Sequence, residues 1–289
     1  MARPSSVPPA IELDRVTFSY PQTDTPILTD ISLRVEPGEF LGIVGPTGSG
    51  KTTLLYLMAG IIPHYFRGQI DGRITIDGRP TSALTLAQLT ERVGVVLQDP
   101  EAQLFNLLVR DELAWGLENR GHSRESIAHD VAATVALFHI EHLRDRITYD
   151  LSGGEKQRVA LAAVHALAPH VFLFDNPTSQ LDPLGAADVL ESIRQVADTH
   201  GFSIVLVEDK VDELVRVADR IVLLDRGRIT LDAAPREFCL SAEPLARAGV
   251  RSTQVAELSA ALMAAAVQFA DAVPITVEEA VPALRKLLA

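Results

Sequence analysis

The sequence predicts an α/β protein that combines a mixed, largely parallel sheet with an antiparallel β-subdomain, a helical insert and a small C-terminal appendage. Continuous apolar runs, each bordering a polar or glycine-rich loop, are typical of strands buried on both faces, and there are three of them: Phe40–Val44, Val171–Phe174 and Ile204–Val207. Apolar and polar residues alternate over 11–18 and 31–35, which predicts half-buried antiparallel strands.

The composition is that of a globular protein. The chain has 289 residues, of which 47% are hydrophobic and 22% charged, and a formal net charge of −12. This acidic balance argues against a nucleic-acid partner. The single cysteine, Cys239, cannot pair within the chain, which favours a reducing compartment. No run approaches the roughly 18–20 apolar residues that cross a bilayer, so we expect membrane contact only through partners.

The chain divides into three parts by composition and pattern. Residues 1–10 predict a flexible arm that lacks the apolar centre of a signal peptide. Residues 11–235 are the main domain, with a helical insert at about 100–165. Residues 236–289 are the C-terminal helical appendage.

Shorter patterns complete the expected elements. Asp71–Pro80 predicts a strand ending in an Asp-Gly turn, and Ile221–Leu224 and Ile229–Leu231 predict a final strand pair. In the appendage, the alanine-rich segment Ala256–Ala272 predicts a helix. The form of a capping box at 276–279 predicts a last helix to about Leu288.

A phosphate-binding loop follows the first buried strand. The pattern G-x-x-x-x-G-K-[ST] is matched between a strand and a helical run, by Gly45, Pro46, Thr47, Gly48, Ser49, Gly50, Lys51 and Thr52, with Thr53 as the next candidate contact. Glycines let backbone amides cradle phosphate oxygens, and the helix N-terminus adds positive potential. Lys51 would reach the β- and γ-phosphates, and the Thr52 hydroxyl would bind Mg²⁺. This motif predicts nucleoside triphosphate binding and does not by itself separate a kinase, a GTPase and a transport ATPase.

A second glycine turn precedes the next predicted helix. In Leu151–Gln157 (LSGGEKQ), Ser152 and Glu155 form a capping-box pattern, so a helix should begin here and run to about Leu167. The free amides around Gly153 and Gly154 make this end a candidate second anion site, the local alternative being a plain helix cap. The following buried strand ends in Asp175, the expected Mg²⁺-holding aspartate of a phosphate-loop enzyme.

With these motifs in this order, residues 11–235 resemble the ATP-binding cassette (ABC) ATPases. The resemblance implies that two subunits sandwich two ATP molecules, each between the phosphate loop of one subunit and the LSGGEKQ-type signature motif of the other. It also implies a role for Tyr20 in stacking on adenine, the alternative being an ordinary core aromatic. Gln98 matches the glutamine that senses Mg²⁺ and the membrane partner, and Ser179–Asp182 matches the D-loop.

The segment Asp99–Asn119 resembles that of energy-coupling-factor (ECF) importers, the ABC systems for vitamins and transition-metal ions. There it helps to receive helices of a transmembrane subunit, so the resemblance implies a peripheral position on the cytoplasmic face of the cell membrane. The appendage, residues 236–289, also resembles that subgroup, and the resemblance implies that it can contribute to ATPase dimerisation. The apolar candidates for this contact, which are equally candidates for the core of the insert itself, are Phe105, Leu107, Leu108 and Trp115.

Two positions depart from the family pattern. Where the family carries a glutamate after Asp175, this chain has Asn176, whose amide cannot accept a proton from water at neutral pH. Where the family carries a histidine, Asp209 stands, and a carboxylate within ~4 Å of a γ-phosphate charge would be repelled by about 4 kcal/mol at an effective dielectric of 20. We therefore expect Asp209 to point away or to be compensated by Lys210.

These observations predict an ATPase subunit that energises an ABC transporter, with an ECF-type importer of a vitamin or a metal ion favoured. With both departures, treated as independent of each other, the chain's own site should bind ATP better than it cleaves it. An intact signature motif then favours a heterodimer with a second ABC ATPase subunit. The alternatives are a slow homodimeric ATPase, an engineered hydrolysis-deficient protein, a non-transport ABC-type nucleotide clamp and a phosphate-loop kinase.

Overall fold

A computed structural model describes residues 7–23, 25–179, 181–269 and 272–288. The main sheet has six strands in the order β10-β9-β3-β8-β7-β6, and all neighbours run parallel except β10 and β9. Its strands are β3 (Phe40–Val44), β6 (Val93–Val96), β7 (Val171–Asp175), β8 (Ser203–Val207), β9 (Arg220–Asp225) and β10 (Arg228–Ala233). Every residue of β3, β7 and β8 is buried, which confirms the three apolar runs as strands covered on both faces.

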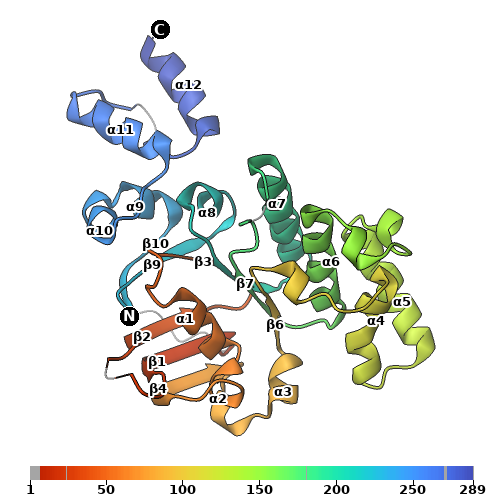
Figure 1. The fold of residues 1–289 in the computed structure, drawn as a ribbon. Coiled ribbons are helices and arrows are strands. Elements are labelled where there is room, and N and C mark those ends of the chain that lie inside the picture. Colours follow the sequence, from red (N-terminus) through yellow and green to blue (C-terminus); the bar gives the residue numbers. More distant parts are fainter. Residues whose placement is uncertain (1–6, 24, 180, 270–271, 289) are drawn as a thin grey trace.

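A second, antiparallel sheet has four strands in the order β2-β1-β4-β5. These are β1 (Ile11–Ser19), β2 (Leu28–Val35), β4 (Gln69–Ile76) and β5 (Arg79–Pro80). Alternate residues of β1 and β2 are buried, as their sequence pattern predicts, with irregular pairing after Leu13. Figure 1 shows this sheet below the main sheet, on the same side as α1.

Twelve α-helices are found in the described residues, and Figure 1 shows α4–α6 gathered on one side of the main sheet while α11 and α12 project above it. They are α1 (Lys51–Met58), α2 (Ile61–His64), α3 (Leu86–Thr90), α4 (Val109–Asn119), α5 (Arg124–Leu137), α6 (Gly153–Ala166), α7 (Pro183–His200), α8 (Val211–Val217), α9 (Pro235–Leu240), α10 (Ala242–Ala248), α11 (Gln254–Ala264) and α12 (Val277–Leu288). None of them, over the described residues, is long and apolar enough to span a bilayer.

The helix expected over 256–272 is shorter in the structure. α11 ends at Ala264, and Ala266 adopts a left-handed φ of 64° while its N–H donates to the Met263 carbonyl. A left-handed residue stops the helical ladder, and the segment 267–269 is not helical. Residues 270–271 of the expected helix lie outside the described part of the chain, as do residues 1–6 of the expected arm.

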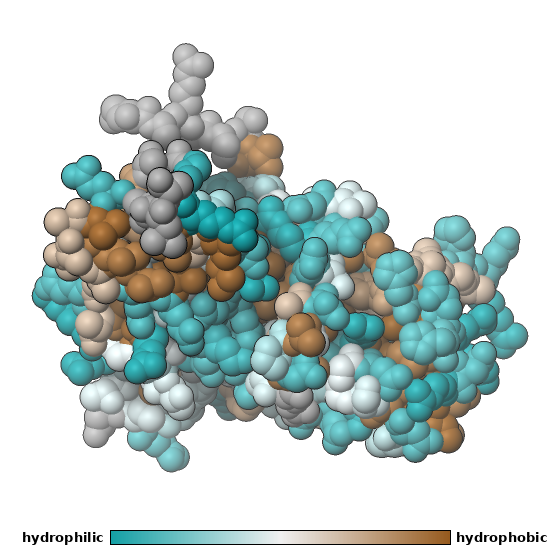
Figure 2. Space-filling model, turned by 90° about the horizontal axis from the view of Figure 1, so that it is seen from above, coloured by the Kyte–Doolittle hydropathy of each residue, from teal (hydrophilic) through white to brown (hydrophobic). Residues whose placement is uncertain are grey.

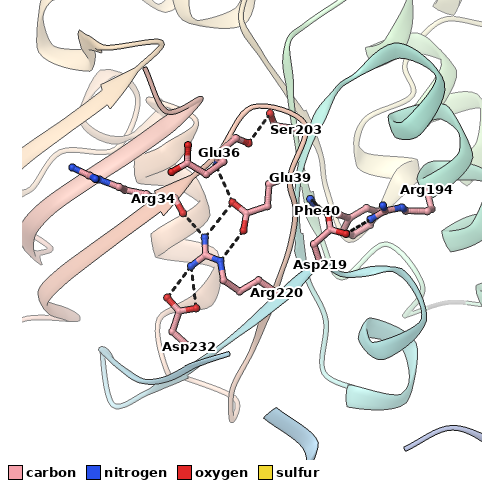
Figure 3. A network of polar contacts seen from close by, with 9 residues as sticks. All are labelled: Arg34, Glu36, Glu39, Phe40, Arg194, Ser203, Asp219, Arg220 and Asp232. Atoms are coloured by element: carbon pink, nitrogen blue, oxygen red, sulfur yellow. Dashed lines mark hydrogen bonds and ion pairs between the residues drawn. The ribbon is translucent and has the colours of Figure 1, made fainter. Parts of the chain in front are cut away.

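A half-buried guanidinium joins the two sheets at the end of the molecule where β3 begins (Figure 3). Arg220 of β9 donates from Nε to Glu39 Oε1 (2.7 Å) and from Nη1 to both carboxylate oxygens of Asp232 (3.0 and 2.8 Å). Its Nη2 also donates to the Arg34 carbonyl on β2. All of these partners are backbone or carboxylate oxygens, so Arg220 holds β2, β10 and the start of β3 together.

Arg220→Ala is expected to lower the free energy of unfolding by about 2–3 kcal/mol, because the mostly buried Glu39 carboxylate would lose its cation. Denaturant unfolding measures this change. The matched control is Arg34→Ala, which removes only the exposed ion pair with Glu12 and should cost under about 1 kcal/mol. Equal losses in the two variants would contradict the role given to Arg220.

Candidate functional site

The phosphate loop connects β3 to α1, as the motif requires. Gly50 caps α1 at φ 106° and Gly48 has φ 79°, conformations that glycine adopts without strain. A Cβ on Gly45 would lie 2.1 Å from the Leu224 carbonyl oxygen, so the close passage of the loop beside β9 needs a glycine there. The Ser49 carbonyl accepts the Gly227 N–H (3.0 Å), which ties the loop to the turn between β9 and β10.

A pocket of about 470 Å³ opens above the loop. It is lined by Tyr20, Ile27, Thr47, Gly48, Gly50, Lys51, Thr52, Thr53, Gln98, Asp175, Asn176, Val207 and Asp209. The structure thus brings the two predicted carboxylates, the glutamine, the aromatic and most of the loop together. Gly45, Pro46 and Ser49 support the loop without lining this pocket. Gly45 and Pro46 border a neighbouring pocket that also touches Gly249–Ser252 of the appendage.

Lys51 is the cation of the pocket, and its side chain is only 10% exposed. Its ammonium donates to the carbonyls of Gly45 (2.7 Å) and Pro46 (3.2 Å). It also lies 3.1 Å from Asp209 Oδ1. The expectation that Asp209 would point away or be paired with Lys210 is therefore not what the structure shows, since Lys210 pairs with Glu213 (2.7 Å).

Asp175 ends β7 at the floor of the pocket and is buried. Burial raises the pKa of its carboxyl, while a hydrogen bond with the Thr52 side chain and the charge of Lys51 oppose that rise. Gln98 lines the same pocket, so a hydroxyl, a carboxylate and an amide converge there. Oxygen donors of this kind are the ligands that Mg²⁺ prefers, so the residues present fit that ion.

Tyr20 is half-buried at the rim of the pocket. Its ring packs edge-on against Phe18 with centroids 4.8 Å apart, and its hydroxyl lies 3.3 Å from Thr53 Oγ1. The ring is thus held by the core on one side and lines the pocket on the other. The core contact agrees with the interpretation of Tyr20 as a core aromatic, and the stacking of its ring on adenine stays a prediction.

Asn176 adopts a left-handed φ of 49°, which asparagine tolerates better than most residues. Its backbone N–H donates to the Val207 carbonyl (2.8 Å), and its side-chain Nδ2 donates to Asp209 Oδ2 (3.2 Å). The two departures from the family pattern are therefore in direct contact. They are not independent in space, contrary to their treatment from the sequence.

Glu208 is a buried carboxyl that sequence reasoning missed, because it directly follows the apolar strand β8 and matches no motif. It is 1% exposed, and the Thr178 Oγ1 lies 2.6 Å from Glu208 Oε1 and 2.6 Å from Glu213 Oε2. Burial raises the pKa of Glu208 to about 7, and the neighbouring Glu213 adds to that rise. Thr178 directly precedes the D-loop, Ser179–Asp182. Within the D-loop, Gln180 lies outside the described residues, and Asp182 caps α7.

The signature motif forms the amino end of α6 as expected. The Ser152 hydroxyl accepts the Glu155 N–H (3.4 Å) and Glu155 Oε2 accepts the Ser152 N–H (2.7 Å), which confirms the capping box. Ser152 and Gly153 are exposed, and Gly154 and Glu155 are half-buried. The structure does not bring these residues to the phosphate-loop pocket, whose lining contains none of them.

The segment 99–119 exposes some of its apolar side chains and buries others, among them Leu104, Val109, Leu113 and Leu117. Phe105, Leu107 and Trp115 are 55%, 59% and 44% exposed, and Phe105 stacks edge-on against Trp115 at 5.2 Å. Leu108 is half-buried and pairs with Ile147. We call Phe105, Leu107, Trp115 and the neighbouring exposed Ile147 and Tyr149 the insert patch.

A buried carboxylate shapes this exposed loop. Glu112 is 6% exposed, and its Oε2 accepts the backbone N–H groups of Phe105 (3.1 Å) and Asn106 (2.7 Å). These bonds fix the loop before α4 so that its apolar side chains face outward. The loop that carries Phe105 therefore has a conformation fixed by hydrogen bonds.

A phosphate loop connects β3 of the parallel core to α1, and it faces an aspartate at the end of β7, with β8 between the two strands. This arrangement defines a phosphate-loop nucleotide-binding protein. The sequence model of the family described as ABC transporter matches residues 28–179. An ABC transporter ATP-binding protein of Pyrococcus abyssi is 42% identical over 83% of this chain and 86% of that protein. The chain belongs to the ABC transporter family, as an ATP-binding ATPase subunit whose expected activity is ATP hydrolysis.

Two further comparisons bear on size and shape. An ABC transporter ATP-binding protein of Methanosarcina mazei is 35% identical over 90% of this chain, which spans only 44% of that protein's length. The structure of cbiO1 from Clostridium perfringens, part of the ABC transporter complex cbiONQ, has a TM-score of 0.76 and 28% identity. It covers 87% of this chain, and this chain covers 98% of it. The fold predicted from the sequence is therefore confirmed.

Proposed function

We propose that this chain is one of two ATPase subunits of an ECF-type importer, and that its own phosphate-loop site holds ATP more than it hydrolyses it. One observation carries the proposal: Asn176 and Asp209 contact each other inside the pocket, while the intact signature motif lies outside it. We therefore propose that the signature motif of this chain supports ATP hydrolysis at the partner's phosphate loop, while its own phosphate-loop site hydrolyses ATP slowly. The likeness to cbiO1 supports the ECF assignment, and a vitamin or a metal ion is the proposed cargo.

In the proposed site, Lys51 binds the β- and γ-phosphates, and Thr52, Asp175 and Gln98 hold Mg²⁺. The ion would supply charge neutralisation on the phosphates. Asn176 can orient water through its amide but cannot take its proton. Slow hydrolysis in this half of the dimer follows, because no general base stands in that place.

The insert patch is the proposed contact for a transmembrane subunit, with the chain bound peripherally on the cytoplasmic face of the membrane. Its aromatic and aliphatic side chains are exposed on a fixed loop, the arrangement expected of a docking surface. The appendage is the proposed dimer contact. Figure 2, which looks down on the C-terminal helices, shows apolar surface gathered there, and Leu258, Met263, Val277 and Val281 are exposed.

Lys51→Ala is expected to weaken ATP binding by the purified chain at least fiftyfold, because Lys51 is the cation of the pocket. Isothermal titration calorimetry measures the affinity. The matched control is Lys156→Ala, which removes a lysine of the signature helix outside the pocket and should leave the affinity unchanged. Wild-type affinity in Lys51→Ala would show that the phosphate loop does not bind the nucleotide.

Asn176→Glu is expected to change the ATPase rate of the assembled transporter complex by no more than about threefold, because the companion subunit's site sets the rate. The new glutamate would also have to adopt the left-handed φ of 49°. Steady-state phosphate release from the complex gives the rate. A rise of tenfold or more would mean that this site limits turnover, which would contradict the holding role proposed for it.

A further inference from the structure

The ammonium of Lys51 already has a complete set of partners within the chain. An ammonium group has three N–H donors, and the structure gives Lys51 three acceptors: the carbonyls of Gly45 (2.7 Å) and Pro46 (3.2 Å) and the Asp209 carboxylate (3.1 Å). The two carbonyls belong to the loop itself and move with it. The carboxylate comes from the far wall of the pocket, after β8, and is the only charged member of the set.

The Asp209 carboxylate is held from its other side as well. While Oδ1 faces Lys51, Oδ2 accepts a hydrogen bond from Asn176 Nδ2 (3.2 Å). The left-handed backbone of Asn176, fixed by its N–H bond to the Val207 carbonyl, aims the amide at Asp209. Each departure from the family pattern thus supports the other, and together they bind the phosphate-loop lysine.

Besides Lys51, two cationic residues line a neighbouring pocket together with Asp209, namely Lys210 and Arg251. Lys210, the adjacent residue, is engaged with Glu213 at 2.7 Å. Asp175 lies in the same pocket and adds a second carboxylate. The side chain of Asp209 is 56% exposed, however, so it has room to swing outward into solvent.

We infer that Asp209, oriented by Asn176, is an intramolecular competitor for Lys51 that lowers the preference of this site for triphosphate over diphosphate. The inference rests on the proposed function, because it requires that nucleotide phosphates bind at Lys51. A γ-phosphate brought to Lys51 must displace the carboxylate and then remains near it. A diphosphate ends one phosphate earlier and meets less of that repulsion.

The experiment measures nucleotide affinities of the full chain by isothermal titration calorimetry in two series. The first uses ATP and ADP in EDTA, which prevents hydrolysis. The second uses a non-hydrolysable ATP analogue and ADP with Mg²⁺. Asp209→Asn keeps the shape and removes the charge. We expect it to strengthen ATP binding about tenfold and ADP binding no more than about threefold. The control Asp212→Asn removes the same charge from the exposed start of α8, and should change neither affinity by more than about 1.5-fold.

Two further variants guard against a merely structural effect. Asp209→Glu keeps a carboxylate and should keep the ATP-to-ADP ratio within about twofold of wild type. Asn176→Ala removes the amide that orients Asp209 and should raise the ratio by a smaller factor than Asp209→Asn does. If Asp209→Asn unfolds, Asp209→Ser provides the same test.

An unchanged ratio in Asp209→Asn, with Lys51→Ala still losing affinity, overturns the inference and leaves the proposed function standing. The same shift in Asp212→Asn overturns it too, because the effect would then be general electrostatics. Wild-type affinity in Lys51→Ala, or no nucleotide binding by any variant, overturns the proposed function itself. ATP binding that is measurable only in Asp209→Asn or Asp209→Ser supports the inference.

Discussion

Gly45→Ala is expected to abolish nucleotide binding and to lower the free energy of unfolding by at least about 3 kcal/mol. The added Cβ would lie 2.1 Å from the Leu224 carbonyl oxygen and 2.8 Å from Ser49 Oγ. The first of these is backbone inside the main sheet, so it cannot rotate away. The loop would have to leave β9, and the Gly45 carbonyl that holds Lys51 would leave with it.

Calorimetric titration with ATP and denaturant unfolding measure the two effects. Gly153→Ala is the matched control, since nothing lies within 4 Å of its added Cβ and its backbone needs no left-handed conformation. It should leave both the stability and the nucleotide affinity of the isolated chain unchanged. If the signature motif serves a partner's ATP, the same control should lower the ATPase rate of the assembled complex. Full binding by Gly45→Ala would mean that the loop is not held against β9 as described.

The sequence predicts the phosphate loop and the signature helix well because local rules determine them. A strand, a glycine-rich turn and a helix follow one another within residues 40–58, and the Ser152–Glu155 capping box is complete within four residues. The buried strands are also predicted from local sequence, because a short apolar run with polar ends is typical of a strand covered on both faces. None of these predictions needs knowledge of which distant residues meet.

Elements stabilised by distant contacts are harder to predict. Strand β6 (Val93–Val96) was not expected, because it is four residues long and contains a glycine. The structure explains the glycine: a Cβ on Gly94 would lie 2.4 Å from Val164 of α6, so its absence lets the signature helix approach the sheet. The end of α11 was missed for the opposite reason, since alanine composition favours a longer helix than the tertiary structure allows.

The contact between Asn176 and Asp209 could not be derived from the sequence, which places them 33 residues apart. From the sequence, each departure from the family pattern is expected to weaken a different part of a hydrolytic site. In contact they do something that neither does alone, since they hold a carboxylate against the phosphate-loop lysine. This mutual contact is the reason for proposing that the site holds ATP more than it hydrolyses it.

Glu208→Gln is expected to change the free energy of unfolding, relative to wild type, by about 3 kcal/mol more in the stabilising direction at pH 8 than at pH 4. Thr178 has one hydroxyl hydrogen, yet its oxygen is 2.6 Å from oxygens of both Glu208 and Glu213. The hydroxyl can donate to only one of them, so the other carboxyl must carry a proton and donate it to the hydroxyl oxygen. Glu208 is the group that holds it, because burial raises its pKa from 4.5 to about 7.

The sign of the pH dependence follows from that pKa. Between pH 4.5 and 7 the folded chain retains a proton that the unfolded chain has lost, so this group's contribution falls as pH rises and levels off above pH 7. A rise of about 2.5 pKa units corresponds to about 3 kcal/mol. Glutamine is neutral throughout and can donate its amide hydrogen to Thr178, so the variant should lack this fall.

Denaturant unfolding of both proteins between pH 4 and 8.5 gives the difference curve. Glu213→Gln is the matched control, because it removes a carboxylate from the same hydroxyl but leaves Glu208 buried, and it should keep most of the fall. Parallel curves for wild type and Glu208→Gln would mean that Glu208 is ionised in the folded chain. The hydrogen on Thr178 would then have to be shared between two charged carboxylates with Lys210 alone to offset them.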